Sequence, residues 1–288
     1  MKYGLVLEGG AMRGLFTAGA LDVFMEAGIH FDGLVGVSAG AVFGCNFKSG
    51  QIGRVLRYNR RYCRDWRYCS WRSLLLTGNM FGADFCYRKI PEELDPFDRA
   101  AFEADPTEFY LVCTDVRSGK PVYWRCGRAD KSCMERMRAS ASMPFVSSMV
   151  EIDGGLYLDG AITDSIPLEF MERSGYRRNV VILTRPEGYL KKETSLQWLL
   201  NIVYRKYPAF RRALADRHLV YNAQTEYVLR RRDEGDVLVI RPEAPLPVQR
   251  ITKDPGLIQE TYDIGRRTAA KQLERLREFL RADRSDRK

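Results

Sequence analysis

Short apolar runs alternate with amphipathic stretches over the first fifty residues. Residues 3–7 and 31–37 are apolar runs typical of strands buried on both faces. Between them, apolar side chains recur at helical spacing at Phe16, Ala20, Val23 and Ala27. Gly28 then marks the end of this helix, and a second helix is predicted over residues 39–47. Strand–helix–strand–helix order predicts an α/β fold: a three-layer sandwich with a mostly parallel central sheet.

The pattern changes along the rest of the chain. Further strands are predicted at residues 108–114, 121–126, 180–184 and 237–240, with a helix over residues 130–142. Residues 149–159 read as a hairpin that turns at Asp153. Beyond residue 186 the composition becomes more helical and more basic. We therefore expect a catalytic α/β domain over residues 1–186 and a mainly helical, basic region over residues 187–288, packed on the core.

Composition excludes several classes of protein. The 288 residues are 45 % hydrophobic, with 46 Lys+Arg against 37 Asp+Glu, a formal charge of +9. This balance is ordinary for a globular protein, and no apolar run reaches the roughly 18 residues of a membrane span. Seven cysteines without a C-x-x-C pair favour a reducing compartment, so a cytoplasmic location is expected. Neither a metal nor another cofactor is expected, because no set of residues has ligand spacing.

A serine between two glycines is the first candidate for chemistry. Gly36, Ser38 and Gly40 fit G-x-S-x-G directly after a predicted strand and before a predicted helix. Such a turn exposes the hydroxyl at a helix N-terminus, where the dipole favours developing negative charge. The alternative is that Ser38 only caps the helix and the glycines serve packing.

A serine nucleophile needs a base, and the chain holds only two histidines. His30 falls in the turn before the second strand, and His218 falls in the basic helical region without a motif around it. We therefore look for a carboxylate. Asp159, followed by Gly160 and Ala161, stands at the end of a predicted strand, although Asp-Gly is usually a turn signal. Asp153 is a second Asp-Gly, and it fits the turn of the predicted hairpin.

Taken together, three segments resemble the patatin-like phospholipases. They are the loop of residues 8–14 (EGGAMRG), the G-V-S-A-G of residues 36–40 and the D-G-A of residues 159–161. Two further stretches strengthen the resemblance, R-A-S-A-S-M-P at 138–144 and D-S-I-P at 164–167. The family implies a Ser–Asp dyad that acts on lipid acyl esters, here Ser38 with Asp159 as general base. The segment ending at Pro167 follows Asp159 at the family's spacing, which favours Asp159 over Asp153.

The resemblance also assigns the glycine loop as an oxyanion hole, in which backbone N–H groups converge on the developing charge. The residues of this loop are Gly9, Gly10, Ala11, Met12, Arg13 and Gly14. Ala11 departs from the family's triple glycine, and its Cβ is unfavourable if the residue adopts φ > 0. A dinucleotide-binding loop is the rival interpretation, since Gly9, Gly14 and the later Asp32 nearly match that fingerprint. It leaves Ser38 and Asp159 unexplained.

A basic, aromatic stretch follows the second predicted helix. Between Gln51 and Arg72, seven arginines face one aspartate, interleaved with tyrosine and tryptophan. This composition suits a nucleic-acid groove or an anionic lipid surface, and a solvated helix face is the plainer alternative. With the resemblance, we expect no nucleic-acid partner. We expect a lipid-facing surface that includes Arg57, Arg60, Arg64 and Trp66, and peripheral contact with the inner face of an anionic membrane.

The sequence thus predicts a serine lipid acyl hydrolase. An acyltransferase, or a lipid- or nucleotide-binding protein on the same scaffold, is the alternative. Head-group and acyl-position preference and oligomeric state are not predicted by the sequence.

Overall fold

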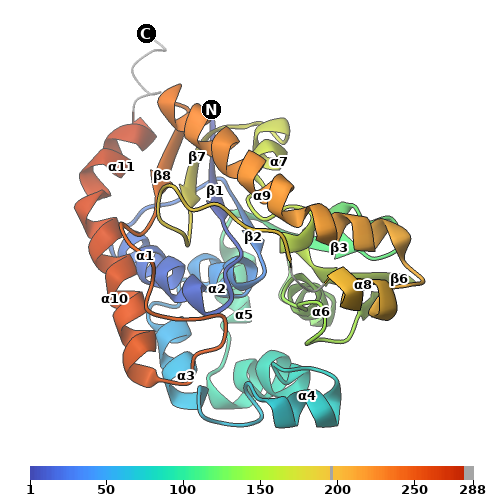
Figure 1. Ribbon diagram of the computed structural model, residues 1–288. Coiled ribbons are helices and arrows are strands. Elements are labelled where there is room, and N and C mark those ends of the chain that lie inside the picture. The colour runs from blue at the N-terminus through green and yellow to red at the C-terminus, as the bar shows by residue number, and fades with distance from the viewer. Residues whose placement is uncertain (195–196, 282–288) are drawn as a thin grey trace.

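A computed structural model describes residues 1–194 and 197–281, and its centre is a mixed sheet (Figure 1). The strands are β1 (Lys2–Leu7), β2 (Gly33–Val37), β3 (Glu108–Asp115), β4 (Pro121–Arg125), β5 (Val150–Ile152), β6 (Gly155–Asp159), β7 (Tyr176–Ile182) and β8 (Val237–Ile240). They are ordered β5-β6-β3-β2-β1-β7-β8, with β4 paired to β3. The five strands β3-β2-β1-β7-β8 run parallel, and β4, β5 and β6 add antiparallel pairings. The predicted mostly parallel sheet is confirmed.

Helices surround the sheet. The α-helices are α1 (Gly14–Glu26), α2 (Ala39–Lys48), α3 (Arg54–Tyr62), α4 (Trp71–Thr77), α5 (Arg99–Ala104), α6 (Lys131–Ser140), α7 (Leu168–Arg173), α8 (Gln197–Val203), α9 (Pro208–Asp233), α10 (Pro255–Lys271) and α11 (Leu273–Arg281). Shorter or wider turns form η1 (Ala11–Arg13), the π-helical η2 (Phe85–Leu94) and η3 (Gly160–Ile162).

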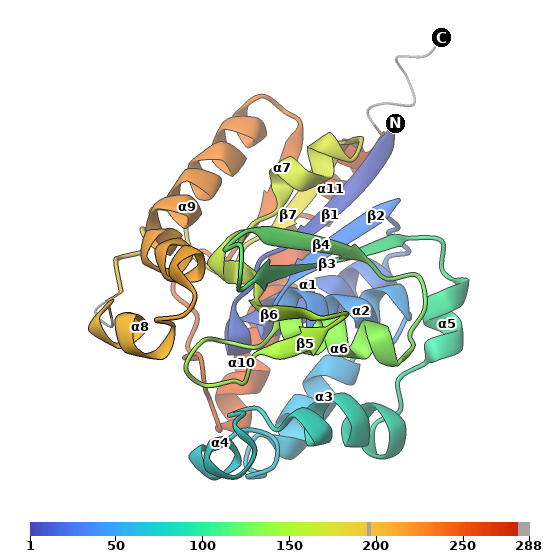
Figure 2. The same cartoon turned by 90° about the vertical axis from the view of Figure 1, so that its right-hand side faces the viewer.

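Alternation along the strands separates two cores. In β1, Leu5 and Leu7 pack with α1 and α2, whereas Val6 packs with α7 and α9 on the other face. Successive side chains of a strand point to opposite faces, so a continuous apolar run is the pattern of a strand covered on both sides. Figure 2 shows the sheet between these two helical layers. The expected three-layer α/β sandwich is confirmed.

The C-terminal region contributes to the sheet as well as to its covering. Its strand β8 pairs parallel with β7, and α10 lies along α1. The helices touch at glycines: a Cβ at Gly19 would lie 2.1 Å from the Tyr262 carbonyl oxygen, and one at Gly265 would lie 2.0 Å from that of Phe16. The predicted division at residue 186 stays a prediction, and residues 195–196 and 282–288 of the second region lie outside the described residues.

Candidate active site

Ser38 occupies a strained turn between β2 and α2. Its backbone has φ +55° and ψ −122°, a region that non-glycine residues rarely adopt. The flanking glycines make room for the turn: a Cβ at Gly36 would lie 2.5 Å from the Ala41 Cα, and one at Gly40 would lie 2.5 Å from the Leu7 carbonyl oxygen. The turn therefore requires glycine on both sides of Ser38.

Ser38 and Asp159 meet across the sheet. The Ser38 Oγ donates a hydrogen bond of 2.7 Å to the Asp159 Oδ2, and both residues are only 5 % exposed. The other carboxylate oxygen, Oδ1, accepts the Ala161 N–H at 2.8 Å. Gly160 lets this turn pack on β3, because a Cβ there would lie 2.2 Å from the Val112 carbonyl oxygen. The two side chains are thus held in contact although 121 positions separate them in the chain.

Burial sets the electrostatics of Asp159. Loss of hydration raises the pKa of its carboxyl above the ordinary value, and the nearby Arg217 guanidinium and the hydrogen bonds from Ala161 and Ser38 oppose that rise. A carboxylate with a raised pKa is a stronger base than an exposed one. This is the property required of a group that takes a proton from a serine hydroxyl.

The segment over residues 138–144 supports both members of this pair. The Ser140 Oγ accepts the Ser38 N–H at 3.0 Å and donates to the Val112 carbonyl oxygen at 2.7 Å. Two residues later, the Ser142 carbonyl oxygen accepts the Asp159 N–H at 2.8 Å. One segment therefore fixes the backbone of both residues, which gives a physical reason for the R-A-S-A-S-M-P pattern.

The glycine loop lies beside the pair. A Cβ at Gly9 would lie 3.2 Å from the Ser38 Cβ and 3.3 Å from the Ala161 Cβ. The Arg13 N–H donates to the Gly10 carbonyl oxygen, and the Gly14 N–H donates to carbonyl oxygens of the loop, so these two amides are engaged locally. The first N–H groups of η1 have no partner within their own helix. The oxyanion hole over residues 9–14 stays a prediction, and these local bonds make the Arg13 and Gly14 amides less suited to it than the other amides of the loop.

Ala11 adopts φ +48°, the conformation in which its Cβ is unfavourable. Ala11→Gly is therefore expected to stabilise the protein. Relief of the left-handed backbone gains about 1–2 kcal/mol, and the greater freedom of glycine in the unfolded chain offsets about 0.4–1 kcal/mol. Equilibrium denaturant unfolding should give a net gain of about 1 kcal/mol. Ala100→Gly, at an exposed position of α5 without positive φ, is the control and should be neutral or destabilising. A loss of stability in the Ala11→Gly variant would contradict the backbone strain at Ala11.

An apolar pocket opens next to Ser38. Ala11, Met12 and Ser38 are among its lining residues, and about 920 Å³ of space lies within it, open solvent at its mouth included. The remaining lining is mainly aliphatic, aromatic and sulfur-containing side chains: Ala39, Val42, Phe43, Cys45, Arg54, Tyr58, Tyr68, Phe81, Cys86, Tyr87, Ile90, Pro91, Phe97, Met134, Met137, Ala141 and Met143. This shape and polarity suit a hydrocarbon chain.

The other candidate bases lie elsewhere. His30 is exposed before β2, and His218 faces the carbonyl oxygen of Ala215 within α9. Asp153 is exposed in the hairpin turn, where it and Gly154 both have positive φ. In the described residues neither histidine forms a hydrogen bond with Ser38.

A group of residues that the sequence did not single out lies beside the glycine loop, and part of it comes from α9. Glu8 is buried, and its carboxylate accepts the Tyr221 hydroxyl at 2.8 Å and the Thr184 hydroxyl at 3.1 Å. Arg217 of α9 donates from Nε to the Ala161 carbonyl oxygen at 2.6 Å. The only signal for Glu8 is its place between the first strand and the glycines. Nothing in the sequence of α9 marks its residues.

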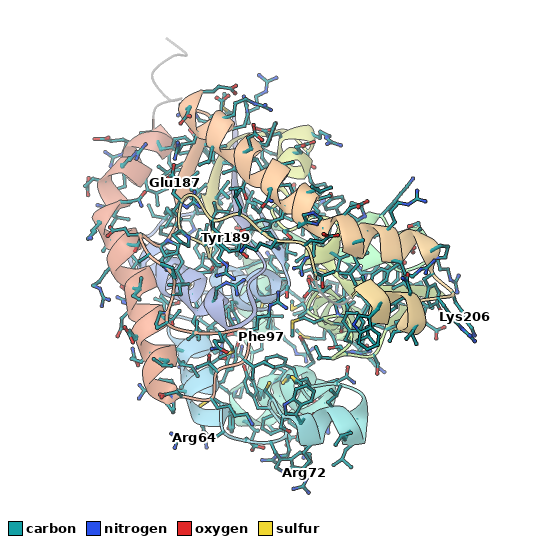
Figure 3. All side chains as sticks on the ribbon, viewed as in Figure 1. Arg64, Arg72, Phe97, Glu187, Tyr189 and Lys206 are labelled. Atoms are coloured by element: carbon teal, nitrogen blue, oxygen red, sulfur yellow. The ribbon has the colours of Figure 1, made fainter. Side chains whose placement is uncertain are left out.

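Several side chains of the expected lipid-facing surface have partners within the protein. Arg57 forms two hydrogen bonds with the Asp95 carboxylate, at 2.7 and 2.9 Å, and Arg60 donates to Gln259 at 2.7 Å. Trp66 lies under the Arg72 guanidinium, 4.3 Å from it, and Arg64 lies at the lower edge in Figure 3. A lipid-facing role for these residues stays a prediction.

No cluster of three or more His, Cys, Asp or Glu side chains has the arrangement of a metal site within residues 1–194 and 197–281. In the same part of the chain, no helix combines the length and apolar character needed to cross a bilayer.

Comparison with known proteins defines the class. A sequence profile of the patatin-like phospholipases matches residues 5–171, and a profile described as a domain of unknown function, DUF6363, matches residues 207–281. The chain belongs to the patatin-like phospholipase family.

Individual relatives are similar over part of their length. The uncharacterized protein YjjU of Escherichia coli is 30 % identical over 226 residues, covering 73 % of this chain and 63 % of that protein. The uncharacterized NTE family protein Rv1063c of Mycobacterium tuberculosis is 26 % identical, covering 58 % of this chain and 44 % of the relative. The lysophospholipase nte1 of Aspergillus fumigatus is 27 % identical, covering 60 % of this chain and 11 % of that protein. The chain thus spans less than two thirds of the length of these relatives. At family level they support a lipid hydrolase.

Proposed function

We propose that the protein is a serine lipid acyl hydrolase that cleaves acyl esters through an acyl-enzyme on Ser38, with Asp159 as general base. One observation carries the proposal: the Ser38 hydroxyl donates at 2.7 Å to a buried carboxylate, at the end of an apolar pocket. A merely capping serine would need neither the strained turn nor a buried acid as its partner.

The geometry suggests the order of proton transfers. Asp159 accepts the Ser38 proton as Oγ attacks the ester carbonyl carbon, and the charge that develops on the carbonyl oxygen faces the amides of Gly10, Ala11 and Met12. As the C–O bond breaks, Asp159 returns the proton to the leaving alcohol. Water then loses a proton to Asp159, attacks the acyl-enzyme and releases the fatty acid, and Ser38 regains its proton.

The pocket accounts for the acyl side of the substrate. Its lining offers one charged side chain, Arg54, which is already bonded to the Asp95 carbonyl oxygen and the Asn46 side chain. The rest of the lining is largely apolar, and each CH₂ of a fatty acyl chain buried there contributes about 0.8 kcal/mol to binding.

Contact with a membrane is supported best at α4. The bridge between Cys69 and Phe81 closes the segment that holds this helix, and Tyr68 and Phe81 line the pocket. Trp71 and Leu75 of α4 are 70 % and 86 % exposed, and Arg72 lies beside Trp66. Apolar side chains among arginines are typical of a surface that binds an anionic interface, such as the inner leaflet met by a cytoplasmic enzyme.

Replacing Leu75 and Leu76 together by Ser is expected to weaken binding to anionic vesicles about tenfold or more, because each leucine contributes about 1.5–3 kcal/mol when it leaves water. Vesicle sedimentation at low salt measures this. Leu219→Ser, an equally polar change at an exposed leucine of α9, is the control. Equal binding by all three proteins would remove α4 from the proposed interface.

A lipid panel tests the hydrolase itself. The protein is expected to react with a fluorophosphonate at Ser38 and to release fatty acid from at least one lipid ester, with no added metal. If Ser38 is labelled and the acyl group is transferred to an added alcohol without release of free fatty acid, an acyltransferase is favoured. Absence of labelling and of turnover would favour the non-catalytic binding protein.

A further inference from the structure

Five cations gather around the glycine loop and are not part of the pocket lining. We call them the cationic cluster: Arg13, Arg185, Lys191, Arg217 and Arg250. Arg13 comes from η1, Arg185 and Lys191 from the segment after β7, Arg217 from α9 and Arg250 from the segment before α10. In Figure 3, Tyr189, whose ring lies 4.3 Å from the Arg185 guanidinium, is labelled above Phe97, which lines the pocket.

Hydrogen bonds and a cation–π contact connect the cluster to the dyad. Arg217 donates a hydrogen bond to the carbonyl oxygen of Ala161, and the Ala161 N–H donates to the Asp159 carboxylate. Lys191 Nζ lies 3.8 Å from the centre of the Tyr221 ring, and the hydroxyl of that ring binds Glu8, next to Gly9. The cluster is therefore connected to residues beside the dyad, and its five side chains are not among those that line the apolar pocket.

The charge of the cluster is not balanced within the protein. Glu8 and Asp159 are the acids that interact with it, and both already accept hydrogen bonds from neutral groups. Within residues 1–194 and 197–281, none of the five cations forms a salt bridge, and the buried Nε of Arg13 has no hydrogen-bond partner. Other arginines here are paired, for example Arg231 with Glu172 and Arg266 with Glu26. The five cationic side chains thus outnumber the two carboxylates, Glu8 and Asp159, that interact with them.

Arg13, Arg185, Lys191 and Arg217 are half-buried and Arg250 is exposed, and the electrostatics of the four half-buried cations are unfavourable without an anion. Burial, followed by repulsion from Arg217, lowers the pKa of Lys191 to about 6; Arg13 and Arg250 add to the repulsion, and Glu8 opposes it. Burial also lowers the pKa of Arg13, with further repulsion from Arg185 and Arg250. Unpaired charges removed from water destabilise a folded protein unless a counter-charge binds.

We propose that the cationic cluster binds a phosphate group on the alcohol side of the substrate, so that the enzyme prefers acyl esters bearing a phosphate monoester over zwitterionic or neutral esters. This inference rests on the proposed hydrolase function. Guanidinium groups bind phosphate oxygens through paired, charge-assisted hydrogen bonds, and a dianion matches the excess of positive charge. With the acyl chain in the pocket, the phosphate of a monoacyl glycerophosphate lies on the side of Ser38 where the cluster is.

The test compares three monomeric short-chain esters with the same acyl group: monoacylglycerol, its phosphate monoester and its phosphocholine. Monomeric substrates separate recognition from membrane binding. We expect kcat/KM to be about 10- to 100-fold higher for the phosphate monoester than for the neutral ester, as one or two charge-assisted hydrogen bonds provide. Lys191→Met, which keeps an apolar stem on Tyr221, and Arg250→Ala should each lower that ratio about tenfold. Lys192→Ala, an exposed neighbour with the same loss of charge, should leave it unchanged.

Glycerol 3-phosphate separates the outcomes. Calorimetry with Ser38→Ala protein should detect its binding, and Lys191→Met should weaken that binding about tenfold. Binding without hydrolysis of any ester would support the cluster and overturn the hydrolase. Hydrolysis with equal kcat/KM for all three esters and no glycerol 3-phosphate binding would overturn the cluster alone. Binding of inorganic phosphate with no preference among the esters would assign the cluster to a free anion and overturn the headgroup role.

Discussion

Ser38→Ala is expected to lower lipid ester hydrolysis by at least about 10⁴-fold and to abolish fluorophosphonate labelling. No other hydroxyl donates to the Asp159 carboxylate within the described residues, so the variant has a base without a nucleophile. The comparable loss in a serine protease is on the order of 10⁶-fold. Titration of released fatty acid from the preferred lipid measures the effect.

Two measurements make this result interpretable. Ser132→Ala, an exposed serine of α6, is the matched control and should keep full activity and labelling. Thermal unfolding should show that the Ser38→Ala protein remains folded, since it keeps the Ser38 backbone contact with Ser140. A folded variant that still releases fatty acid at the wild-type rate would exclude Ser38 as the nucleophile.

Asp159→Asn is expected to lower turnover by about 10²–10⁴-fold without destabilising the protein. Asparagine retains an oxygen for the Ala161 N–H but cannot accept the serine proton. Activity at the wild-type level would move the role of base to Asp153 or His218. Asp153→Asn, in the exposed hairpin turn, is the matched control and should be fully active.

The pH dependence of activity and of stability should have opposite signs at Asp159. Burial raises its pKa in the folded protein. The base is active only when ionised, so turnover should fall on acidification at a pH above the ordinary aspartate range. The carboxyl stabilises the fold fully below its unfolded pKa, and this contribution is lost as pH rises through the folded pKa. Asp159→Asn should therefore unfold at an equal or higher temperature than wild type at neutral pH.

Local patterns predicted the elements that carry the fold. The apolar run at β1 and the helical spacing of Phe16, Ala20 and Val23 each match a buried element. Burial on both faces requires such patterns, so they are readable from neighbouring residues alone. Near the end of the chain, Ala269, Leu273, Leu276 and Leu280 recur at helical spacing, a pattern typical of one helix packed on the core. These residues do pack there, but on two helices, because α10 ends before α11 begins at Leu273.

Contacts between segments far apart in the chain could not be predicted from the sequence patterns. The sequence indicated Ser38 and Asp159 as separate motifs, but their 2.7 Å hydrogen bond depends on how β2, β3 and β6 lie together. The positive φ of Ala11 depends in the same way on its neighbours in the loop. For Arg57 and Arg60 the sequence showed charge but not the partners Asp95 and Gln259, 38 and 199 positions away. The run of arginines taken by itself therefore suggests more unpaired charge on the surface than the structure has.

The sequence by itself determined the class of fold and indicated the serine turn with its glycines, because each depends on residues adjacent in the chain. The scarcity of histidine over the whole chain led to an acid as the predicted base. Tertiary structure alone decided that α9 brings Arg217 to the carbonyl beside Asp159, and that Lys191 and Arg13 gather near it. Coulomb repulsion and desolvation act through space over a few ångströms. Which charges share that space depends on the packing of distant segments, and no local pattern records it.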